Sequence, residues 1–441
     1  MLKKALRNPL LLQSLVSIIA RFVGVALNFA VAKIITTELP RAEAGMLFLL
    51  MTFVTGFALF SRIGIDQLLI KEVASAKEND DAFKHGFLRS SYRFIAIFSL
   101  GFMTFWLILS PLLQKHFFDN QINLNYLMLA SVGILFYNVV VINSTYLKAI
   151  KQTVKAVLSQ NALPAITLLV LLAFFWSSFR EQQAFINIYT FSLFLAGVIA
   201  ITMTRSAVFS TSASALSNPK NSQGLKSLIK KSLPLAPISF ISFLMIFADK
   251  IMVGLYLTNA DVALYEIAGR VSFIVLFFLG ALEATIYPRL LNVSTQNPAH
   301  LRSFFWQSTA LVIAIVFSIT LAMYFLSDLI LGFFGNTQND YTFASESLQI
   351  LLFAQLLRAI SLTFSFMFII REKVRYLNII LGLALATNLI CNAFLIPQYG
   401  INGAALATLF ANAFLLVAVL SLFFFHKLLQ RTNQSQGAES A

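Results

Sequence analysis

The sequence predicts an all-α membrane protein of twelve transmembrane helices in two six-helix lobes. Two observations on composition predict this fold class: 59% of the 441 residues are hydrophobic, and only 11% are charged. A soluble domain carries about 25% charged residues, and one soluble core could not bury this much apolar surface. The third observation is that the apolar residues gather in segments close to the ~20 residues with which an α-helix spans a bilayer.

Twelve apolar segments follow one another along the chain, and we expect each to form one membrane-spanning helix. The first follows Lys3, Lys4 and Arg7, like the apolar part of a signal peptide. It continues past Arg21 to Ile35, so we interpret it as a span that is not cleaved. The segments are residues 12–35, 45–65, 91–113, 124–147, 157–177, 184–203, 234–257, 264–287, 305–331, 348–370, 376–396 and 403–426.

The basic residues outside these segments or at their ends are distributed unequally between the two sides of the membrane. With twelve spans, both termini lie on one side, and that side holds 23 basic residues. The other side holds three, which are Arg41, Lys115 and Arg180. By the positive-inside rule, the side of the termini is cytoplasmic. Topology therefore explains most of the net charge of +14, and we expect no nucleic-acid partner.

The longest cytoplasmic connection, residues 204–233, separates an N-terminal lobe, 1–203, from a C-terminal lobe, 234–441. Its second part, Leu225–Ser232, is basic and amphipathic. That pattern fits either a helix on the inner leaflet or a solvated linker. Short sequence similarities between the lobes recur at an offset of about 216 to 220 residues. They indicate a parallel six-span repeat, and repeats of this kind are common in transporters.

The loops contain no pattern typical of catalysis. They carry no Gly-rich phosphate loop, no metal-ligand spacing and no nucleophile motif, so an ATP-driven motor within this chain is excluded. Cys391 is the single cysteine, which rules out an intrachain disulfide. We therefore expect no cofactor, no metal and no enzymatic activity.

Five cations lie inside the expected spans: Arg21, Lys33, Lys250, Arg270 and Arg358. A charge at bilayer depth costs at least ~2.5–3.5 kcal/mol, so such residues usually face a wet, protein-lined interior. Arg21 and Arg358 lie near the middle of their segments, one in each half, with no acid at i±3 or i±4. Guanidinium binds phosphate in bidentate fashion and stays charged when buried. We predict a cationic cavity for an anionic cargo; pairing with acids elsewhere in the bundle is the alternative.

The other charged residues in the spans have simpler explanations available. Arg270 has Glu266 four residues before it, which predicts a helical ion pair. Lys250 follows Asp249, but adjacent helical residues point about 100° apart and need not pair. Lys33 is close enough to the outer face to snorkel. The acids that could couple transport to a cation, or pair with a cation, are Asp249, Glu266 and Glu283.

Arg62 and Asp66 predict a second helical ion pair, at the cytoplasmic end of the second span. Several amide side chains also lie within the spans. They could bond sugar hydroxyls, but hydrogen bonding between helices is the commoner role. These amides are Asn28, Asn138, Asn143, Asn161, Gln307, Gln355, Asn388 and Asn392.

Two motifs resemble a known family. Asp249–Gly254, followed by Ala263–Tyr265 and Ala268–Arg270, resembles the signature of spans 7 and 8 in polysaccharide flippases. Ile396–Thr408 resembles the hairpin between spans 11 and 12 of the same family. Its small residues allow close helix packing. The resemblance covers nearly the whole chain and implies the MOP superfamily, specifically the Wzx-type flippases of O-antigen and related repeat units.

The resemblance implies two lobes around a central cationic cavity that work by alternating access. The implied cargo is an oligosaccharide linked by pyrophosphate to undecaprenol, turned from the cytoplasmic to the outer leaflet of the bacterial inner membrane. The expected partners are the bilayer, this lipid-linked oligosaccharide, and a polysaccharide polymerase with its chain-length machinery.

Two other functions remain open. One is a cation-coupled, MATE-like exporter of drugs or other amphiphiles, although many MATE exporters carry an acid in span 1, where this chain has Arg21. The other is a membrane polysaccharide polymerase or ligase, against which the short outer loops argue. Lipid II flippases also share the resemblance, but typically have fourteen spans.

Overall fold

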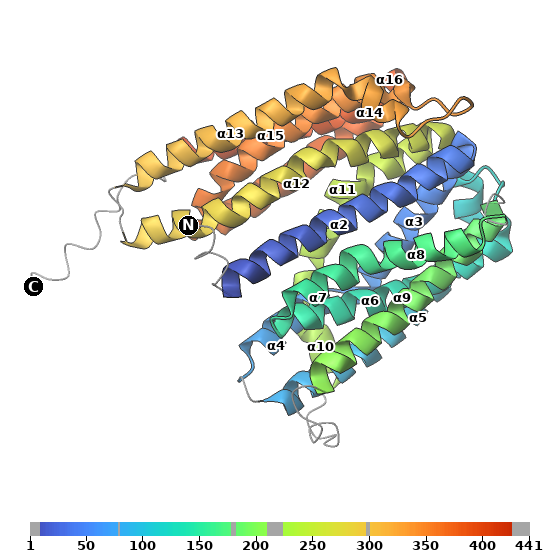
Figure 1. Ribbon diagram of the computed structural model, residues 1–441, viewed down its shortest axis with the longest axis horizontal. Coiled ribbons are helices and arrows are strands. Elements are labelled where there is room, and N and C mark those ends of the chain that lie inside the picture. Colours follow the sequence, from blue (N-terminus) through green and yellow to red (C-terminus); the bar gives the residue numbers. More distant parts are fainter. Residues whose placement is uncertain (1–8, 78–79, 178–181, 210–223, 297–299, 426–441) are drawn as a thin grey trace, which may run out of the picture. The chain divides into compact units, whose positions relative to one another are not determined.

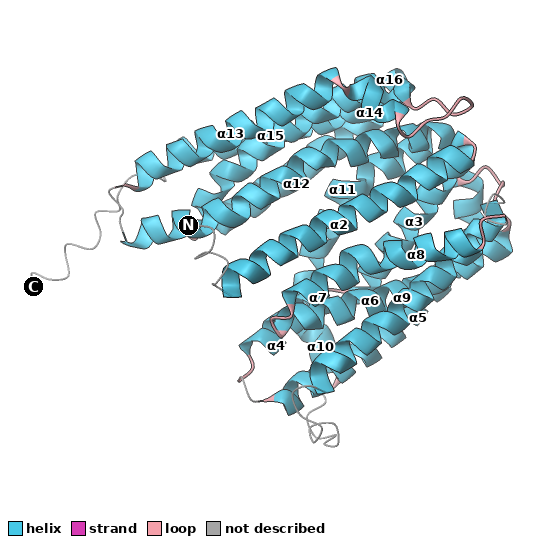
Figure 2. Ribbon diagram, viewed as in Figure 1, coloured by secondary structure: helices cyan, strands magenta, loops and turns pink. Residues whose placement is uncertain are grey.

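A computed structural model describes residues 9–77, 80–177, 182–209, 224–296 and 300–425, and within them it contains helices and loops but no strand (Figure 2). Eleven helices of the described residues are long and apolar enough to cross a membrane. The last two expected spans lie together in one of these helices, Val374–Phe425, which has 52 residues. The all-α, multi-pass fold class is confirmed. The count of twelve spans and the cytoplasmic position of the termini stay predictions.

The chain divides into two compact units, Met1–Phe247 and Ala248–Ala441, which we call unit 1 and unit 2. The division lies within helix α11 (Ala236–Tyr256), whose labelled position can be followed in Figure 1. The lobes expected from the sequence, 1–203 and 234–441, stay a prediction.

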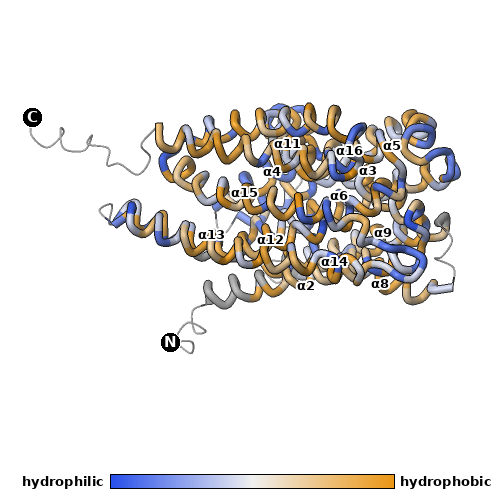
Figure 3. The backbone as a smooth tube through the Cα atoms, turned by 90° about the horizontal axis from the view of Figure 1, so that it is seen from above, coloured by the Kyte–Doolittle hydropathy of each residue, from blue (hydrophilic) through white to orange (hydrophobic). Residues whose placement is uncertain are grey.

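Unit 1 is built from long apolar helices joined by short turns. Figure 3 shows hydrophobic residues along most of the helical tube and hydrophilic residues at many of the turns. Its elements are α2 (Pro9–Glu38), α3 (Arg41–Arg62), α4 (Ile65–Ser75), α5 (Asp81–Phe117), α6 (Leu124–Ala149), α7 (Thr153–Val157), the π-helical turn η1 (Leu158–Ala162), α8 (Leu163–Phe174), α9 (Gln182–Phe209), α10 (Leu225–Ser232), the 3₁₀ turn η4 (Leu233–Leu235) and the first half of α11.

Local sequence signals set where the helices of unit 1 begin and end. Asp80 caps α5 by accepting a 3.0 Å hydrogen bond from the Phe83 amide, and Asn123 caps α6 through the Asn125 amide, also at 3.0 Å. Between α3 and α4 the backbone of Gly64 has φ +76°, a left-handed conformation that favours glycine. These turns place the polar ends of α3, α4 and α6 beside one another.

Aromatic residues form much of the unit 1 core. Trp106 of α5 is fully buried and packs edge-on against Phe57, with ring centroids 4.9 Å apart. Its indole nitrogen donates a 2.9 Å hydrogen bond to the Leu127 carbonyl on α6. The buried indole therefore has its hydrogen bond satisfied and fixes α5 against α6.

Unit 2 contains the end of α11 and six further elements of regular structure in its described residues, with α12, α15 and α16 packed together. Its α16 is two helical segments joined at Gly400, whose φ of 60° and ψ of −139° are not helical. A Cβ atom at Gly403 would collide with the Leu395 carbonyl, so the chain folds back tightly there. The elements are α12 (Asn259–Gln296), α13 (Leu301–Phe325), α14 (Ser327–Gly332), η5 (Thr342–Ala344), α15 (Ser345–Ile370) and α16 (Val374–Phe425).

A smaller aromatic cluster lies between α13, α15 and α16 in unit 2. Phe305, Phe364 and Phe423 are all buried, and the centroids of Phe364 and Phe423 are 5.0 Å apart. Unit 2 therefore has a packed apolar core of its own.

Candidate functional site

The carboxylate of Asp249 in unit 2 is surrounded by neutral hydrogen-bond donors. Its Oδ1 accepts from the amides of Asn388 at 2.8 Å and Asn392 at 2.6 Å. Its Oδ2 accepts from the hydroxyls of Tyr265 at 3.1 Å and Thr408 at 2.5 Å. All four donors are neutral, so none of them supplies a positive charge to the carboxylate. The cluster joins α11, α12 and both segments of α16.

The same cluster holds oxygen atoms that could serve as metal ligands. The Oδ1 atom of Asn392 is buried and has no hydrogen-bond partner in the described part of the chain. Together with the carboxylate of Asp249 and the hydroxyl of Thr408, it supplies the hard oxygen ligands that alkali and alkaline-earth cations prefer. The predicted coupling acid Asp249 thus has a chemically suitable environment, which the sequence did not reveal.

One carboxylate serves two of the predicted cations in unit 2. Glu266 Oε2 is 2.5 Å from Lys250 Nζ, and Glu266 Oε1 is 2.6 Å from Arg270 Nε. Lys250 and Glu266 are buried, whereas the side chain of Arg270 remains 27% exposed. The predicted pair between Arg270 and Glu266 is therefore present, and Lys250 joins it. The triad keeps one net positive charge.

Arg358 lies on α15, half-buried, near the carboxylate of Asp249, which attracts it electrostatically. It forms no direct ion pair with any residue that the structure describes. One turn earlier, Gln355 donates a long 3.5 Å hydrogen bond to Ser272, and its own Oε1 is buried without a partner among the described residues. The alternative to a cavity role, an acid from another helix, is thus present for Arg358, although the two side chains form no direct ion pair.

In unit 1, Arg21 lies on α2 with an exposed side chain. It makes no hydrogen bond or ion pair with the described residues, but it is close enough to Lys148 of α6 for the two cations to repel each other. Lys33 lies twelve residues further along α2, roughly 18 Å away along the helix axis. Lys33 and Arg21 therefore lie at different depths along α2.

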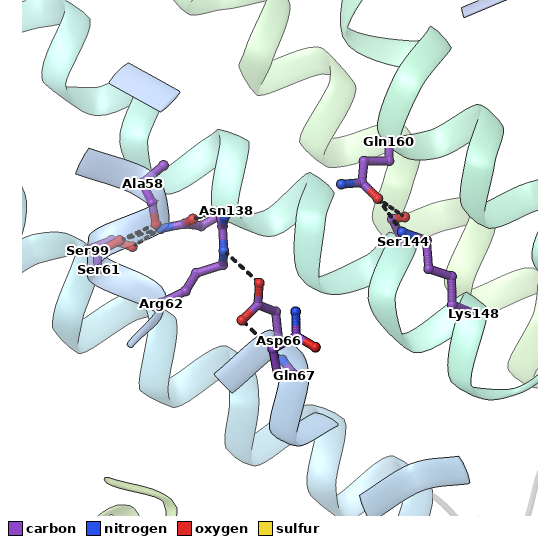
Figure 4. A network of polar contacts seen from close by, with 10 residues as sticks. All are labelled: Ala58, Ser61, Arg62, Asp66, Gln67, Ser99, Asn138, Ser144, Lys148 and Gln160. Carbon is purple, nitrogen blue, oxygen red and sulfur yellow. Dashed lines mark hydrogen bonds and ion pairs between the residues drawn. The ribbon is translucent and has the colours of Figure 1, made fainter. Parts of the chain in front are cut away.

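Arg62 anchors a buried polar network in unit 1 (Figure 4). Its Nη1 donates to Asn138 at 2.8 Å, and its Nε lies 3.4 Å from Asp66. The Asn138 amide in turn donates to the hydroxyls of Ser61 at 2.7 Å and Ser99 at 2.8 Å. The predicted pair of Arg62 and Asp66 is present, and Asn138 bonds between helices as expected. Arg62 is committed to this network.

Glu283, the third candidate acid, lies on α12. Its Oε1 is buried and has no hydrogen-bond partner among the residues described. Of the three acids predicted for coupling or pairing, Glu266 is bound by two cations and Asp249 by neutral donors only.

The sequence did not single out Lys148 and Gln160, which the structure brings together in unit 1. Lys148 Nζ donates to Gln160 Oε1 at 2.5 Å, and the Ser144 hydroxyl donates to the same oxygen at 3.2 Å (Figure 4). The available signal was the polar run Ser159–Asn161 inside an apolar span, followed by Pro164.

Residues 31–341 match the family described as "Polysaccharide biosynthesis protein". The match covers more than two thirds of the chain. The chain belongs to this family. The matched region includes Lys33, Arg62, Asp249, Lys250, Glu266 and Arg270.

A curated relative and two solved structures agree with this assignment. "Probable low-salt glycan biosynthesis flippase Agl15" of Haloferax volcanii is 33% identical over 172 residues, which are 36% of this chain and 34% of that protein. The chain thus aligns with about a third of that relative's length.

The "Lipid II flippase MurJ, inward closed conformation" has a TM-score of 0.70 and 16% identity, with 94% of this chain and 87% of that chain covered. An inward-facing "multidrug resistance MATE family transporter of the MOP superfamily" has a TM-score of 0.66 and 14% identity, with coverage of 93% and 97%. At these identities the likeness concerns the fold alone. The family match confirms the predicted resemblance to a polysaccharide family, and the fold is that of these two transporters.

Proposed function

We propose that this protein is a flippase for a lipid-linked oligosaccharide, which it turns from the cytoplasmic to the outer leaflet. The observation that carries the proposal is the surplus of cations on the membrane helices. Within the expected spans six cations, which are Arg21, Lys33, Arg62, Lys250, Arg270 and Arg358, face four acids, which are Asp66, Asp249, Glu266 and Glu283. Such a surplus suits an anionic headgroup and disfavours an organic cation.

Each unit contributes a guanidinium that no described carboxylate binds directly. We propose that Arg21 of unit 1 and Arg358 of unit 2 attract the pyrophosphate of the substrate, because guanidinium stays charged and bonds phosphate oxygens in bidentate fashion. Lys250 and Arg270 contribute their net charge, and Lys33 acts about three helical turns further along α2 than Arg21. The sugars occupy a hydrated interior, and the polyprenyl chain stays in lipid.

The finer identity of the cargo follows from the family resemblance. We propose an undecaprenyl-pyrophosphate-linked repeat unit of O-antigen or a related surface polysaccharide, in the cytoplasmic membrane of a bacterium. A polymerase and its chain-length machinery would receive the unit at the outer leaflet. The reaction makes and breaks no covalent bond, so this chain needs no catalytic residue.

Substitution of the two guanidinium groups tests the proposal. We expect Arg21→Ala and Arg358→Ala each to lower flipping in reconstituted vesicles by at least about tenfold, the cost of one lost charge-assisted hydrogen bond. In cells, lipid-linked single repeat units should then accumulate in the cytoplasmic leaflet. Accumulation in the outer leaflet would instead indicate a polymerase or ligase.

Two controls make that result interpretable. Arg21→Lys and Arg358→Lys keep the charge but lose the bidentate geometry, so they should retain an intermediate rate. Expression and monodispersity must match the wild type. Full activity of both alanine variants would refute the cationic role. Altered drug sensitivity of a deletion strain with intact surface glycan would favour the exporter of amphiphiles.

A further inference from the structure

A polar cluster lies at the end of α6 that the charge pattern predicts to be cytoplasmic. The Oε1 atom of Gln160 accepts hydrogen bonds from Lys148 Nζ at 2.5 Å and from the Ser144 hydroxyl at 3.2 Å. Because two donors identify this atom as the oxygen, the amide nitrogen of Gln160 must point the other way. Figure 4 shows it directed away from Ser144 and Lys148. Its two N–H donors have no hydrogen-bond partner among the described residues and lie on the side of the Gln160 amide away from Lys148.

The π-helical turn η1 (Leu158–Ala162) brings α2 to this cluster. Asn28 of α2 donates to the Asn161 carbonyl at 3.1 Å. A Cβ atom placed on Gly24 would lie 2.9 Å from the Cβ of Asn161, so the two backbones are nearly in contact. Arg21 lies one turn before Gly24 on the same face of α2. The close approach therefore brings Arg21 toward Gln160 and Lys148.

In the described part of the chain, neither Arg21 nor Lys148 forms a direct ion pair with an acid. Arg21 and Lys148 repel each other, and the acid that attracts Lys148 is Asp66. Asp66 is already paired with Arg62 at 3.4 Å. Two like charges held together gain most from an anion that both can contact. Lys148 gives one of its three donors to Gln160 and keeps two for such an anion.

We propose that Arg21, Lys148 and the amide nitrogen of Gln160 form a phosphate-binding subsite in unit 1. This subsite receives the diphosphate of the lipid-linked substrate at the cytoplasmic side, and this reading rests on the proposed function. The π-helical turn positions the subsite, since it offers the Asn161 carbonyl to α2 and turns Gln160 toward Lys148. Single π-helical turns are frequently found at functional sites.

Binding of a short prenyl diphosphate to the full-length protein tests the subsite. In detergent micelles, the wild type should bind farnesyl diphosphate by calorimetry, and Lys148→Gln and Gln160→Leu should each raise the Kd at least about tenfold. Lys148→Arg keeps the charge and should stay within about threefold. Lys71→Gln removes an exposed lysine of α4 on the same expected side and should leave the Kd unchanged.

Three results would overturn the subsite. The first is a Lys148→Gln variant that elutes as a monodisperse protein and binds farnesyl diphosphate with wild-type affinity. The second is an equal loss in Lys71→Gln, because binding would then depend on overall charge. The third is farnesol that binds to the wild type as tightly as farnesyl diphosphate, because binding would then depend on the prenyl chain and not on the diphosphate.

Flipping assays separate this subsite from the proposed function. If Arg358→Ala abolishes flipping while Lys148→Gln changes neither flipping nor binding, the subsite fails and the flippase proposal stands. If farnesyl diphosphate binding depends on Lys148 but the wild type flips no lipid-linked oligosaccharide, the flippase proposal fails and the subsite stands.

Discussion

At the scale of single residues, Glu266 is the acid whose loss should matter most for folding. Its carboxylate holds Lys250 at 2.5 Å and Arg270 at 2.6 Å, and both Lys250 and Glu266 are buried. Removing one partner of a buried ion pair leaves an uncompensated charge, which costs about 3–5 kcal/mol. Replacing both partners by neutral groups avoids most of that cost.

Glu266→Gln should therefore lower the thermal stability of the purified protein by several degrees, in detergent, by a fluorescence melting measurement. The double variant Lys250→Met with Glu266→Gln should regain most of the loss, because no buried ammonium is left unpaired. A Glu266→Gln variant as stable as the wild type would show that Lys250 finds another partner.

Some ion pairs could be predicted from the sequence and others could not. The pairs of Arg62 with Asp66 and of Arg270 with Glu266 were predictable, because a spacing of four residues places side chains on one helical face. The donors around Asp249 come from positions up to 159 residues away along the chain. Partners so distant along the chain meet only when the helices pack, so a single sequence does not reveal them.

At the scale of helices, α10 (Leu225–Ser232) is more specifically placed than its sequence indicated. Leu228 is buried in the core of unit 1, and Lys231 forms a 3.2 Å ion pair with Glu72 of α4. Leu228 and Ile229 of the apolar face therefore pack against protein, whereas Leu225 remains exposed. Lys226 and Lys230 remain exposed. Amphipathicity predicted which face is covered but did not identify what covers it.

Gly64 is the residue that allows α10 and η4 to pack against the junction of α3 and α4. A Cβ atom there would lie 2.7 Å from the Ser232 carbonyl oxygen and 2.9 Å from the Ala236 nitrogen. These are backbone atoms, which cannot move aside as a flexible side chain would. The φ of +76° adds the cost of a left-handed conformation for any other residue.

We expect Gly64→Ala to destabilise the protein by about 1–3 kcal/mol or more, from backbone strain together with overlap. Gly101→Ala is the matched control, because a Cβ atom at this glycine of α5 meets no atom within 4 Å. It should be neutral or stabilise by up to about 1 kcal/mol. Melting temperatures of the two variants check both expectations. Equal melting temperatures would mean that α10 and η4 can shift away from Gly64.

The positions of the long helices could be predicted well, and their irregularities less so. Apolar length decides where a membrane helix forms, since every backbone polar group must be bonded within the helix. The predicted hairpin at Ile396–Thr408 contains the non-helical Gly400, whose φ is 60°. The π-helical turn at Leu158–Ala162 was not predictable, because it depends on the contact of Asn161 with α2.

At the scale of the whole molecule, the surplus of cations in the predicted spans bears on the energetics of the proposed transport. A cytoplasm that is electrically negative drives anions outward, by about 2.3 kcal/mol per elementary charge per 100 mV. A flippase that moves an anionic headgroup outward therefore gains from the membrane potential directly. Fixed cations lower the cost of dehydrating the headgroup without themselves crossing.

A coupled cation would change this dependence on potential, and Asp249 is the acid best suited to bind one. Its partners among the described residues are neutral donors, whereas Glu266 is bound by Lys250 and Arg270. We propose Asp249 as the coupling acid, with Glu283 as the second candidate. A cation that enters in exchange for the headgroup adds its own charge movement in the same electrical sense.

Flipping in vesicles with an imposed potassium diffusion potential tests this arrangement. The wild-type rate should rise when the side corresponding to the cytoplasm is made negative, because both the anion leaving and a cation entering are then favoured. Asp249→Asn should abolish any dependence of the rate on a sodium or proton gradient while the response to potential persists, since the headgroup still carries its charge. If the rate is indifferent to potential in both proteins, the headgroup crosses with its charge fully compensated. If Asp249→Asn still responds to an ion gradient, coupling belongs to another residue, and Glu283→Gln is the next variant to measure.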